Sequence, residues 1–189
     1  MKNDTLREEM TARQEIYRGT VVHLTRDTVR LPDGGEATRE VVWRRGAVAI
    51  VPLTDSGEVY FVEQYRYPMG QVLLEIPAGK LDPGEPTDEA GRLAAARREL
   101  AEETGFTARE MRYLGEFYGS PAVESEGISL YLATGLSAGS PHPDADEFLE
   151  VERLPLEEAV EEILRGEIPD AKTQVGLLLA RLLREKEEL

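Results

Sequence analysis

The sequence contains no cysteine, so disulfide bonds, thiolate metal sites and a cysteine nucleophile are all excluded. It also lacks long apolar runs. An unbroken apolar stretch such as 47–53 falls far short of the roughly 20 residues that a membrane-spanning helix needs. Residues 1–9 are largely charged and do not resemble a secretory signal. We therefore expect a soluble cytoplasmic protein.

Basic residues are scarce relative to acidic ones. The chain has 22 Lys and Arg against 37 Asp and Glu, which gives a net charge of −15. This imbalance argues against nucleic-acid binding, which needs basic surface to contact phosphates, and we expect neither nucleic acid nor membrane as a partner. Carboxylates are the ligands that hard divalent cations prefer, so cation-assisted chemistry stays open. With 189 residues, 41% of them hydrophobic, the chain can form one folded domain and a small appendage.

The residue pattern predicts strands arranged around one long helix. Two strand-like runs within 20–45 flank the turn signal at 32–35, which is typical of a hairpin. Residues 47–53 are apolar on both faces and are expected to form a central strand. The other expected strands are 58–66, 71–76, 111–118, 128–134 and 148–154, and the expected helices are 87–104, 156–166 and 171–189. This order indicates an α/β fold with a mixed sheet.

The long helix follows a loop, 77–86, that contains three prolines and two glycines. Thr87 or Asp88 is expected to cap the start of the helix, and Gly105 is expected to end it. A glycine-containing loop that leads into a helix allows backbone to approach a phosphate or a metal closely.

Three acids of this helix, Glu99, Glu102 and Glu103, have i, i+3, i+4 spacing and project from one side. Like charges at this spacing repel one another, and a bound divalent cation would reverse the sign of that interaction. In so acidic a chain the same spacing also arises by chance. It recurs without a preceding glycine loop at Glu158, Glu161 and Glu162. The spacing alone therefore does not distinguish a metal site from a solvated helix face, and the surrounding residues decide.

Those surrounding residues form a longer motif. The string RELAEETGF at 98–106, with Gly79 and Glu85 upstream, resembles the signature of the Nudix hydrolases, G-x5-E-x7-R-E-U-x-E-E-x-G-U, where U is aliphatic or aromatic. In this resemblance Arg98, Gly105 and Glu85 occupy structural positions of the motif. It implies a Nudix-type α/β/α sandwich and hydrolysis of a nucleoside diphosphate that is linked to another moiety.

The chain departs from the signature in one respect. Twelve residues separate Glu85 from Arg98, where the family pattern has seven. Counting backward from Arg98 would instead place Gly84 and Ala90 at the glycine and glutamate positions. We prefer the Gly79 register because EIPAGKLDPGE is itself typical of one Nudix branch. The five extra residues are then expected to lengthen the loop or the first turn of the helix, which puts the role of Glu85 in question.

Further segments resemble one branch of the family, the ADP-ribose pyrophosphatases. These are EQYRYPMGQVLLEIPAGKLDPGE at 63–85, a proline sixteen residues after Gly105 (Pro121), and DAKT at 170–173. The resemblance implies cleavage of ADP-ribose to AMP and ribose 5-phosphate. It also implies two or three Mg²⁺ ions per site, with Mn²⁺ as the alternative metal.

The same resemblance implies roles for individual residues. Glu99 and Glu103 match metal ligands, Glu102 matches a further ligand or a water-mediated catalytic partner, and the carbonyl of Ala78 or Gly79 completes the coordination. The general base is expected to come from outside the motif, with Glu147 and Glu126 as the two alternatives.

Expected substrate contacts are Arg66, Trp43, Arg45 and Pro121. The guanidinium of Arg66 suits a phosphate or the terminal ribose, although a surface salt bridge is its structural alternative. Trp43 matches the N-terminal aromatic residues that stack on adenine in relatives, although a lone tryptophan is as often a core or dimer-interface residue.

The resemblance also predicts two domains. Residues 1–45 are expected to form a β-hairpin dimerisation subdomain, residues 46–189 are expected to form the Nudix domain, and the protein is expected to be a homodimer. Two alternatives remain for its function. One is another Nudix substrate, such as a nucleoside diphosphate sugar, coenzyme A or a dinucleoside polyphosphate, and the other is a Nudix fold retained as a non-catalytic ligand-sensing module.

Overall fold

The computed structural model describes residues 4–143 and 147–186, and the chain forms two compact units. The first unit comprises Met1–Arg45 together with Tyr118–Glu126. The second comprises Gly46–Phe117 and Gly127–Leu189. The first unit thus includes a segment from the middle of the chain that the sequence pattern did not connect with the N-terminal strands.

The first unit contains an antiparallel sheet of three strands, β1 (Glu9–Arg18), β2 (His23–Arg30) and β3 (Glu36–Trp43), in the order β1-β2-β3. A short 3₁₀ turn at Asp4–Leu6 precedes it. Strands β2 and β3 form the predicted hairpin, whose turn is stabilised by the Gly35 N–H, which donates to the Asp33 carboxylate at 2.9 Å. Strand β1 was not predicted, because every residue in it is exposed and no alternation of polar and apolar residues marks it.

The second unit contains two sheets. A mixed sheet has the order β7-β4-β9-β8, in which only β4 and β9 run parallel. An antiparallel sheet has the order β10-β5-β6. The strands of both sheets are β4 (Ala47–Pro52), β5 (Glu58–Arg66), β6 (Gln71–Glu75), β7 (Ala78–Lys80), β8 (Phe106–Phe117), β9 (Ile128–Ala138) and β10 (Leu149–Pro155).

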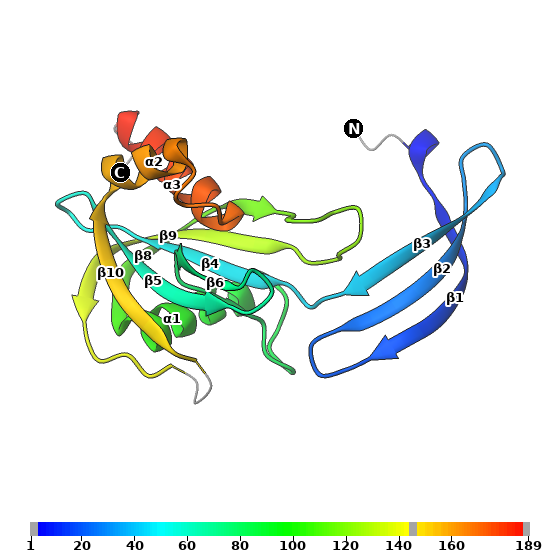
Figure 1. The fold of residues 1–189 in the computed structure, drawn as a ribbon, viewed down its shortest axis with the longest axis horizontal. Helices are drawn as coiled ribbons and strands as arrows, with labels where there is room; N and C mark the ends of the chain where they lie inside the picture. The colour runs from blue at the N-terminus through cyan, green and yellow to red at the C-terminus, as the bar shows by residue number, and fades with distance from the viewer. Residues whose placement is uncertain (1–3, 144–146, 187–189) are drawn as a thin grey trace. The chain divides into compact units, whose positions relative to one another are not determined.

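Strand β4 is the central strand that its apolar sequence predicts, and it is buried on both faces. Val48 and Ile50 pack in a cluster with Leu100 of helix α1 (Glu89–Thr104). The alternate residues Ala49 and Val51 pack in a second cluster with residues of α2 (Leu156–Arg165) and α3 (Ala171–Glu185). Figure 1 shows the resulting layers, with α1 on one side of the sheets and α2 and α3 on the other. The expected α/β sandwich with a mixed sheet is therefore confirmed.

The ends of α1 follow the predicted capping signals. The side chain of Asp88, rather than that of Thr87, caps the helix by accepting a hydrogen bond from the Gly91 N–H at 2.9 Å. Gly105 ends it in the left-handed conformation with φ of 75°, and its N–H donates to the Ala101 carbonyl. Among the described helices, none combines the length and apolar character needed to cross a membrane.

Two features of the sheets escaped the sequence pattern. The three-residue strand β7 lies inside the proline- and glycine-containing loop, where no alternation can be read. Strand β8 starts at Phe106, directly after the helix cap, rather than at residue 111. Strand β7 pairs with Ala47–Ala49 of β4 and also contacts α1, so it places this part of the loop beside the helix.

Two helix-ending glycines allow a matched stability test. Gly105 and Gly166 both have positive φ, 75° and 78°, but a Cβ at 105 would lie 2.7 Å from the backbone nitrogen of Pro141, whereas a Cβ at 166 would meet no atom within 4 Å. We expect Gly166→Ala to lower the free energy of unfolding by about 1 kcal/mol, the cost of a left-handed alanine. Gly105→Ala should cost about 1–3 kcal/mol more because the backbone must also shift. Urea unfolding measures both variants, and equal losses would contradict the close packing at Gly105.

Candidate active site

The loop before α1 approaches the helix so closely that a side chain at Gly79 would displace the carboxyl group of Glu99. A Cβ on Gly79 would overlap the carboxyl group of Glu99. Gly84, in contrast, has no atom near the position that its Cβ would take. This contact favours the register in which Gly79 is the glycine of the motif, and it brings the carbonyl-bearing strand β7 alongside the acids of α1.

Glu103 and Glu99 are buried carboxyls on the side of α1 that faces this loop. Glu103 is 4% exposed and accepts a hydrogen bond from the Ala78 N–H at 3.0 Å. Burial raises the pKa of Glu103 to about 8, against the opposing effect of that hydrogen bond. Glu99 is 8% exposed, and burial raises its pKa to about 7 despite the nearby charge of Arg98. At neutral pH Glu103 therefore favours the protonated form and Glu99 is divided between the two forms, unless a cation compensates their charge.

Among the described residues, Glu147 is an acid from outside the helix whose charge contributes to both of these pKa increases. Glu147 is half-buried and lies two residues before β10, next to the exposed Phe148. The structure therefore brings this expected general base into the neighbourhood of Glu99 and Glu103. Its immediate predecessors 144–146 lie outside the described residues.

Arg98 forms ion pairs with three acids of the motif. Its Nη1 contacts Glu102 at 2.7 Å and Glu99 at 2.9 Å, and its Nε contacts Glu85 at 3.3 Å. These acids raise the pKa of Arg98 far above its ordinary value against the opposing effect of burial. Glu85 thus reaches Arg98 despite the longer spacing between them.

The extra residues are accommodated at the start of the helix. Pro86, Thr87 and Asp88 form the end of the loop, and α1 begins at Glu89. Gly91 in the first helical turn is buried, and a Cβ there would overlap the carbonyl oxygen of Pro86. The extra residues therefore form a tightly packed turn where α1 begins, ahead of the acids of the motif.

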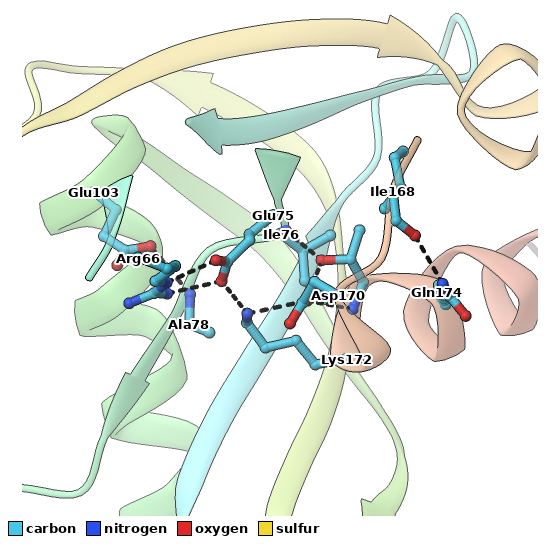
Figure 2. Close-up of polar contacts among 10 residues, drawn as sticks. Arg66, Glu75, Ile76, Ala78, Glu103, Ile168, Asp170, Lys172 and Gln174 are labelled. Carbon is cyan, nitrogen blue, oxygen red and sulfur yellow. Dashed lines mark hydrogen bonds and ion pairs between the residues drawn. The ribbon is translucent and has the colours of Figure 1, made fainter. Parts of the chain in front are cut away.

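Arg66 is the last residue of β5, and its partner is a buried acid, so its ion pair is not a simple surface salt bridge. Its Nε and Nη2 donate to the two carboxylate oxygens of Glu75 at 2.6 and 2.7 Å. Figure 2 shows the side chain of Arg66 between those of Glu103 and Glu75. The pKa of Arg66 is raised, chiefly by the hydrogen bonds to Glu75 and also by the charge of Glu103, so the guanidinium and the buried acid of α1 act on each other.

A pocket of about 420 Å³ opens beside Arg66. Its walls are mostly apolar, with Arg66, Glu75, Asp170 and Lys172 as the charged groups. Glu75 and Lys172 had not been singled out in the sequence, although both lie in segments, EIPAG and DAKT, that carried the family resemblance. The family resemblance of these segments could have pointed to each residue, but sequence spacing cannot predict an ion pair between residues 97 positions apart.

The other expected contacts belong to the first unit, so their placement is described within that unit alone. Trp43 donates from Nε1 to the Thr25 hydroxyl at 2.8 Å, and the guanidinium of Arg13 lies 4.3 Å from its ring centroid. Pro121 and Arg45 are exposed, and Glu126 is half-buried. The end of β3 and the segment 118–126 are joined by a hydrogen bond from the Arg44 N–H to the Ser125 hydroxyl, and all three residues lie in or next to these two segments.

The metal-binding geometry is only partly formed. Within residues 4–143 and 147–186, no three His, Cys, Asp or Glu side chains are placed so that they could hold one ion together. Glu99 and Glu102 are instead drawn toward Arg98. Mg²⁺ takes only one or two protein carboxylates and completes its shell with water and substrate phosphate oxygens. The buried acids, the Gly79 approach and the all-oxygen donor set fit such an ion, provided that Glu99 or Glu102 gives up its contact with Arg98.

The raised pKa values predict how the stability of the metal-free protein depends on pH. Between about pH 4.5 and 8 the folded state retains protons on Glu99 and Glu103 that the unfolded state has lost, so their contribution to stability falls as pH rises. We expect Glu103→Gln to be more stable than the wild type at pH 8.5 in EDTA, and to differ little at pH 5. Thermal unfolding at both pH values measures this. A stability difference that is the same at both would contradict the raised pKa.

Comparisons with known proteins agree with this geometry. Residues 43–174 match the NUDIX domain, and residues 8–42 match the nucleoside diphosphate sugar hydrolase N-terminal domain. The chain is 38% identical over 180 residues to an ADP-ribose pyrophosphatase of Bacillus subtilis (strain 168), covering 94% of this chain and 95% of that protein. It is 41% identical over 178 residues to a methanol dehydrogenase activator of Bacillus methanolicus, covering 93% and 94%.

A solved structure, the crystal structure of ADP compounds hydrolase, superposes with a TM-score of 0.79 at 25% identity, covering 97% of this chain and 98% of that one. The match to the NUDIX domain covers the loop, the helix α1 with its three glutamates, and Arg66. The chain therefore belongs to the Nudix family.

Proposed function

We propose that the protein hydrolyses the diphosphate bond of ADP-ribose to AMP and ribose 5-phosphate with the help of a divalent cation. The observation that carries this proposal is the pair of nearly buried acids, Glu99 and Glu103, packed against Gly79 and next to Arg66. The likeness to an ADP-ribose pyrophosphatase over nearly the whole of both chains supports ADP-ribose as the substrate.

Glu99 and Glu103 are the proposed principal ligands of two or three Mg²⁺ or Mn²⁺ ions, with Glu102 and the carbonyl of Ala78 or Gly79 as further donors. When bound, such ions offset the negative charge of the diphosphate and of the transition state, and they lower the pKa of a bound water. The low exposure of the two acids strengthens each charge interaction, because little water screens it.

The chain's own residues position the substrate and accept a proton. Arg66 retains three N–H groups beyond the two that it donates to Glu75, and these can bind a phosphate or the terminal ribose. A carboxylate takes one proton from the attacking water, whose oxygen forms the new bond to one phosphorus as the bridging oxygen leaves with the other phosphate. Glu147 is the better supported base because its charge acts on both Glu99 and Glu103, and Glu126 remains the alternative. Trp43, Arg45 and Pro121 stay predicted substrate contacts, with Trp43 expected to stack on adenine.

A second candidate function follows from the likeness to a methanol dehydrogenase activator. In that case the same site would serve a regulatory role toward another enzyme. A third possibility is that the substrate is another nucleoside diphosphate derivative. The match of residues 8–42 to the nucleoside diphosphate sugar hydrolase N-terminal domain supports it.

A substrate panel tests the proposal. Purified protein is incubated with ADP-ribose, nucleoside diphosphate sugars, coenzyme A and a dinucleoside polyphosphate, with Mg²⁺, with Mn²⁺ and with EDTA, and the products are separated by chromatography. We expect release of AMP from ADP-ribose at a kcat/KM well above that for the other compounds, and none in EDTA. Preference for another compound would replace the substrate, and no hydrolysis of any compound would favour the regulatory role.

Two glutamine variants test the assignment of α1. Glu103→Gln removes one buried ligand, and we expect it to lower kcat by about 100-fold or more. Its matched control is Glu161→Gln, which changes an exposed acid of the second triplet and should leave kcat unaltered. Near-normal turnover of folded Glu103→Gln would overturn the assignment.

We also propose that the protein is a homodimer. Every residue of the edge strand β1 is exposed, among them the apolar Met10, Ile16 and Tyr17, an arrangement that favours pairing with a second chain. Light scattering should give twice the 21.1 kDa mass of one chain. Ile16→Glu should shift the mass toward one chain, whereas Thr38→Glu on β3 should not. A wild-type monomer at micromolar concentration would contradict the proposal.

A further inference from the structure

Glu75 is a buried acid that the reaction as described does not use. It is 1% exposed, at the end of β6, and two cations contact it: Arg66 and Lys172. Although burial opposes its ionisation, the hydrogen bonds from Arg66 and the charge of Lys172 hold the pKa of Glu75 below its ordinary value. A carboxylate this deep is costly unless its partners remain in place, so the three side chains form one unit.

The contact with Glu75 fixes the orientation of Arg66. Two parallel N–H···O bonds of 2.6 and 2.7 Å join the guanidinium fork to the carboxylate, and this geometry sets the plane of the guanidinium as well as its position. Arg66 and Glu75 project from the same face of the β5–β6 ladder, where Gln71 pairs with Arg66 and Val62 pairs with Glu75. The long side chain of Arg66 therefore runs back along the ladder to reach Glu75, and its remaining N–H groups face away from that carboxylate.

Lys172 and its neighbours connect this unit to the start of α3. Lys172 also pairs with Asp170 at 3.0 Å, and Asp170 caps α3 by accepting from the N–H and hydroxyl of Thr173 at 2.9 and 2.6 Å. The Thr173 hydroxyl in turn accepts from the Ile76 N–H at 2.9 Å. Figure 2 shows these contacts as one chain from Asp170 to Arg66.

This series of polar contacts extends from α3 to Glu103 of α1. Residues 75–78 carry three separate contacts in four positions: Glu75 to Arg66, Ile76 to Thr173, and the Ala78 N–H to Glu103. The same short segment therefore holds both the guanidinium and one buried acid of the site.

We propose that Glu75 and Lys172 are positioning residues, which hold Arg66 in the one orientation that presents its free N–H groups to the diphosphate of the substrate. This proposal rests on the proposed function in that the anion is a nucleoside diphosphate. The competing explanation is that the buried ion pairs only stabilise the junction of β6 and α3. The two differ in whether the effect of Glu75 on turnover passes through Arg66.

A double-mutant cycle separates them. We expect Glu75→Gln to lower kcat/KM for ADP-ribose by about 10- to 100-fold, since a displacement of about 1 Å of a positioning group has effects of that order. In the Arg66→Met background the same change should alter kcat/KM by less than about 2-fold, because no guanidinium remains to be oriented. Lys172→Met, which leaves the Arg66–Glu75 pair in place, should give a smaller loss that also disappears in the Arg66→Met background.

The control is Glu116→Gln, which removes a partly buried partner of Arg92 at 2.9 Å in the same unit and should leave kcat/KM unchanged. Melting temperatures are recorded for every variant. If Glu75→Gln does not fold, the cycle is completed with Lys172→Met. Losses of equal size with and without Arg66 would overturn the positioning role.

Binding distinguishes failure of this proposal from failure of the proposed function. The same cycle is measured by calorimetry with Mg²⁺ and the α,β-methylene analogue of ADP-ribose, which cannot be hydrolysed at that bond. Coupling between Glu75 and Arg66 in binding, with no hydrolysis of ADP-ribose, would overturn the proposed function and support the positioning role. Hydrolysis of ADP-ribose without coupling would support the proposed function and overturn the positioning role. A wild type that neither binds the analogue nor hydrolyses ADP-ribose would overturn both proposals.

Discussion

The burial of two like-charged acids, Glu99 and Glu103, on one face of α1 is the constraint on which the rest of the site depends. Burial is the largest cause that raises the pKa of each acid; the charge of Glu99 adds to the effect on Glu103, and the charge of Glu102 adds to the effect on Glu99. The fold offers only partial compensation, through the Ala78 N–H for Glu103 and Arg98 for Glu99. Such an arrangement is unfavourable as plain structure and becomes favourable when a divalent cation is present.

The loop and strand between Glu75 and Lys80 follow from this constraint. A helix with two inward acids needs backbone donors and acceptors close by, and Gly79 permits that approach because it has no side chain. The same segment anchors itself to α3 through Ile76 and Thr173, so the approach does not depend on the loop alone. Arg98 completes the framework by tying Glu85 of the loop to the helix.

Local signals account for what the sequence predicted well. The i, i+3, i+4 acids, the Asp88 cap and the Gly105 stop depend on neighbours within one or two helical turns, so sequence spacing determines them. Strand β1 escaped because its exposed residues show no alternation, and the grouping of 118–126 with the N-terminal strands depends on contacts between distant segments. The Glu75–Lys172 pair escaped for the same reason, although each residue lay in a segment that resembled the family.

The charges around Arg66 explain why an acidic protein would need cations at this site. Arg66 and Lys172 are matched by Glu75 and Asp170, so this group carries no net charge. Arg66 can therefore supply direction and hydrogen bonds to a diphosphate but little excess positive potential. In a chain of net charge −15, with three more acids on α1, bound metal ions would supply the attraction for an anionic substrate in the proposed reaction. In the proposed reaction, geometry from the guanidinium and charge from the cations would thus be separate contributions.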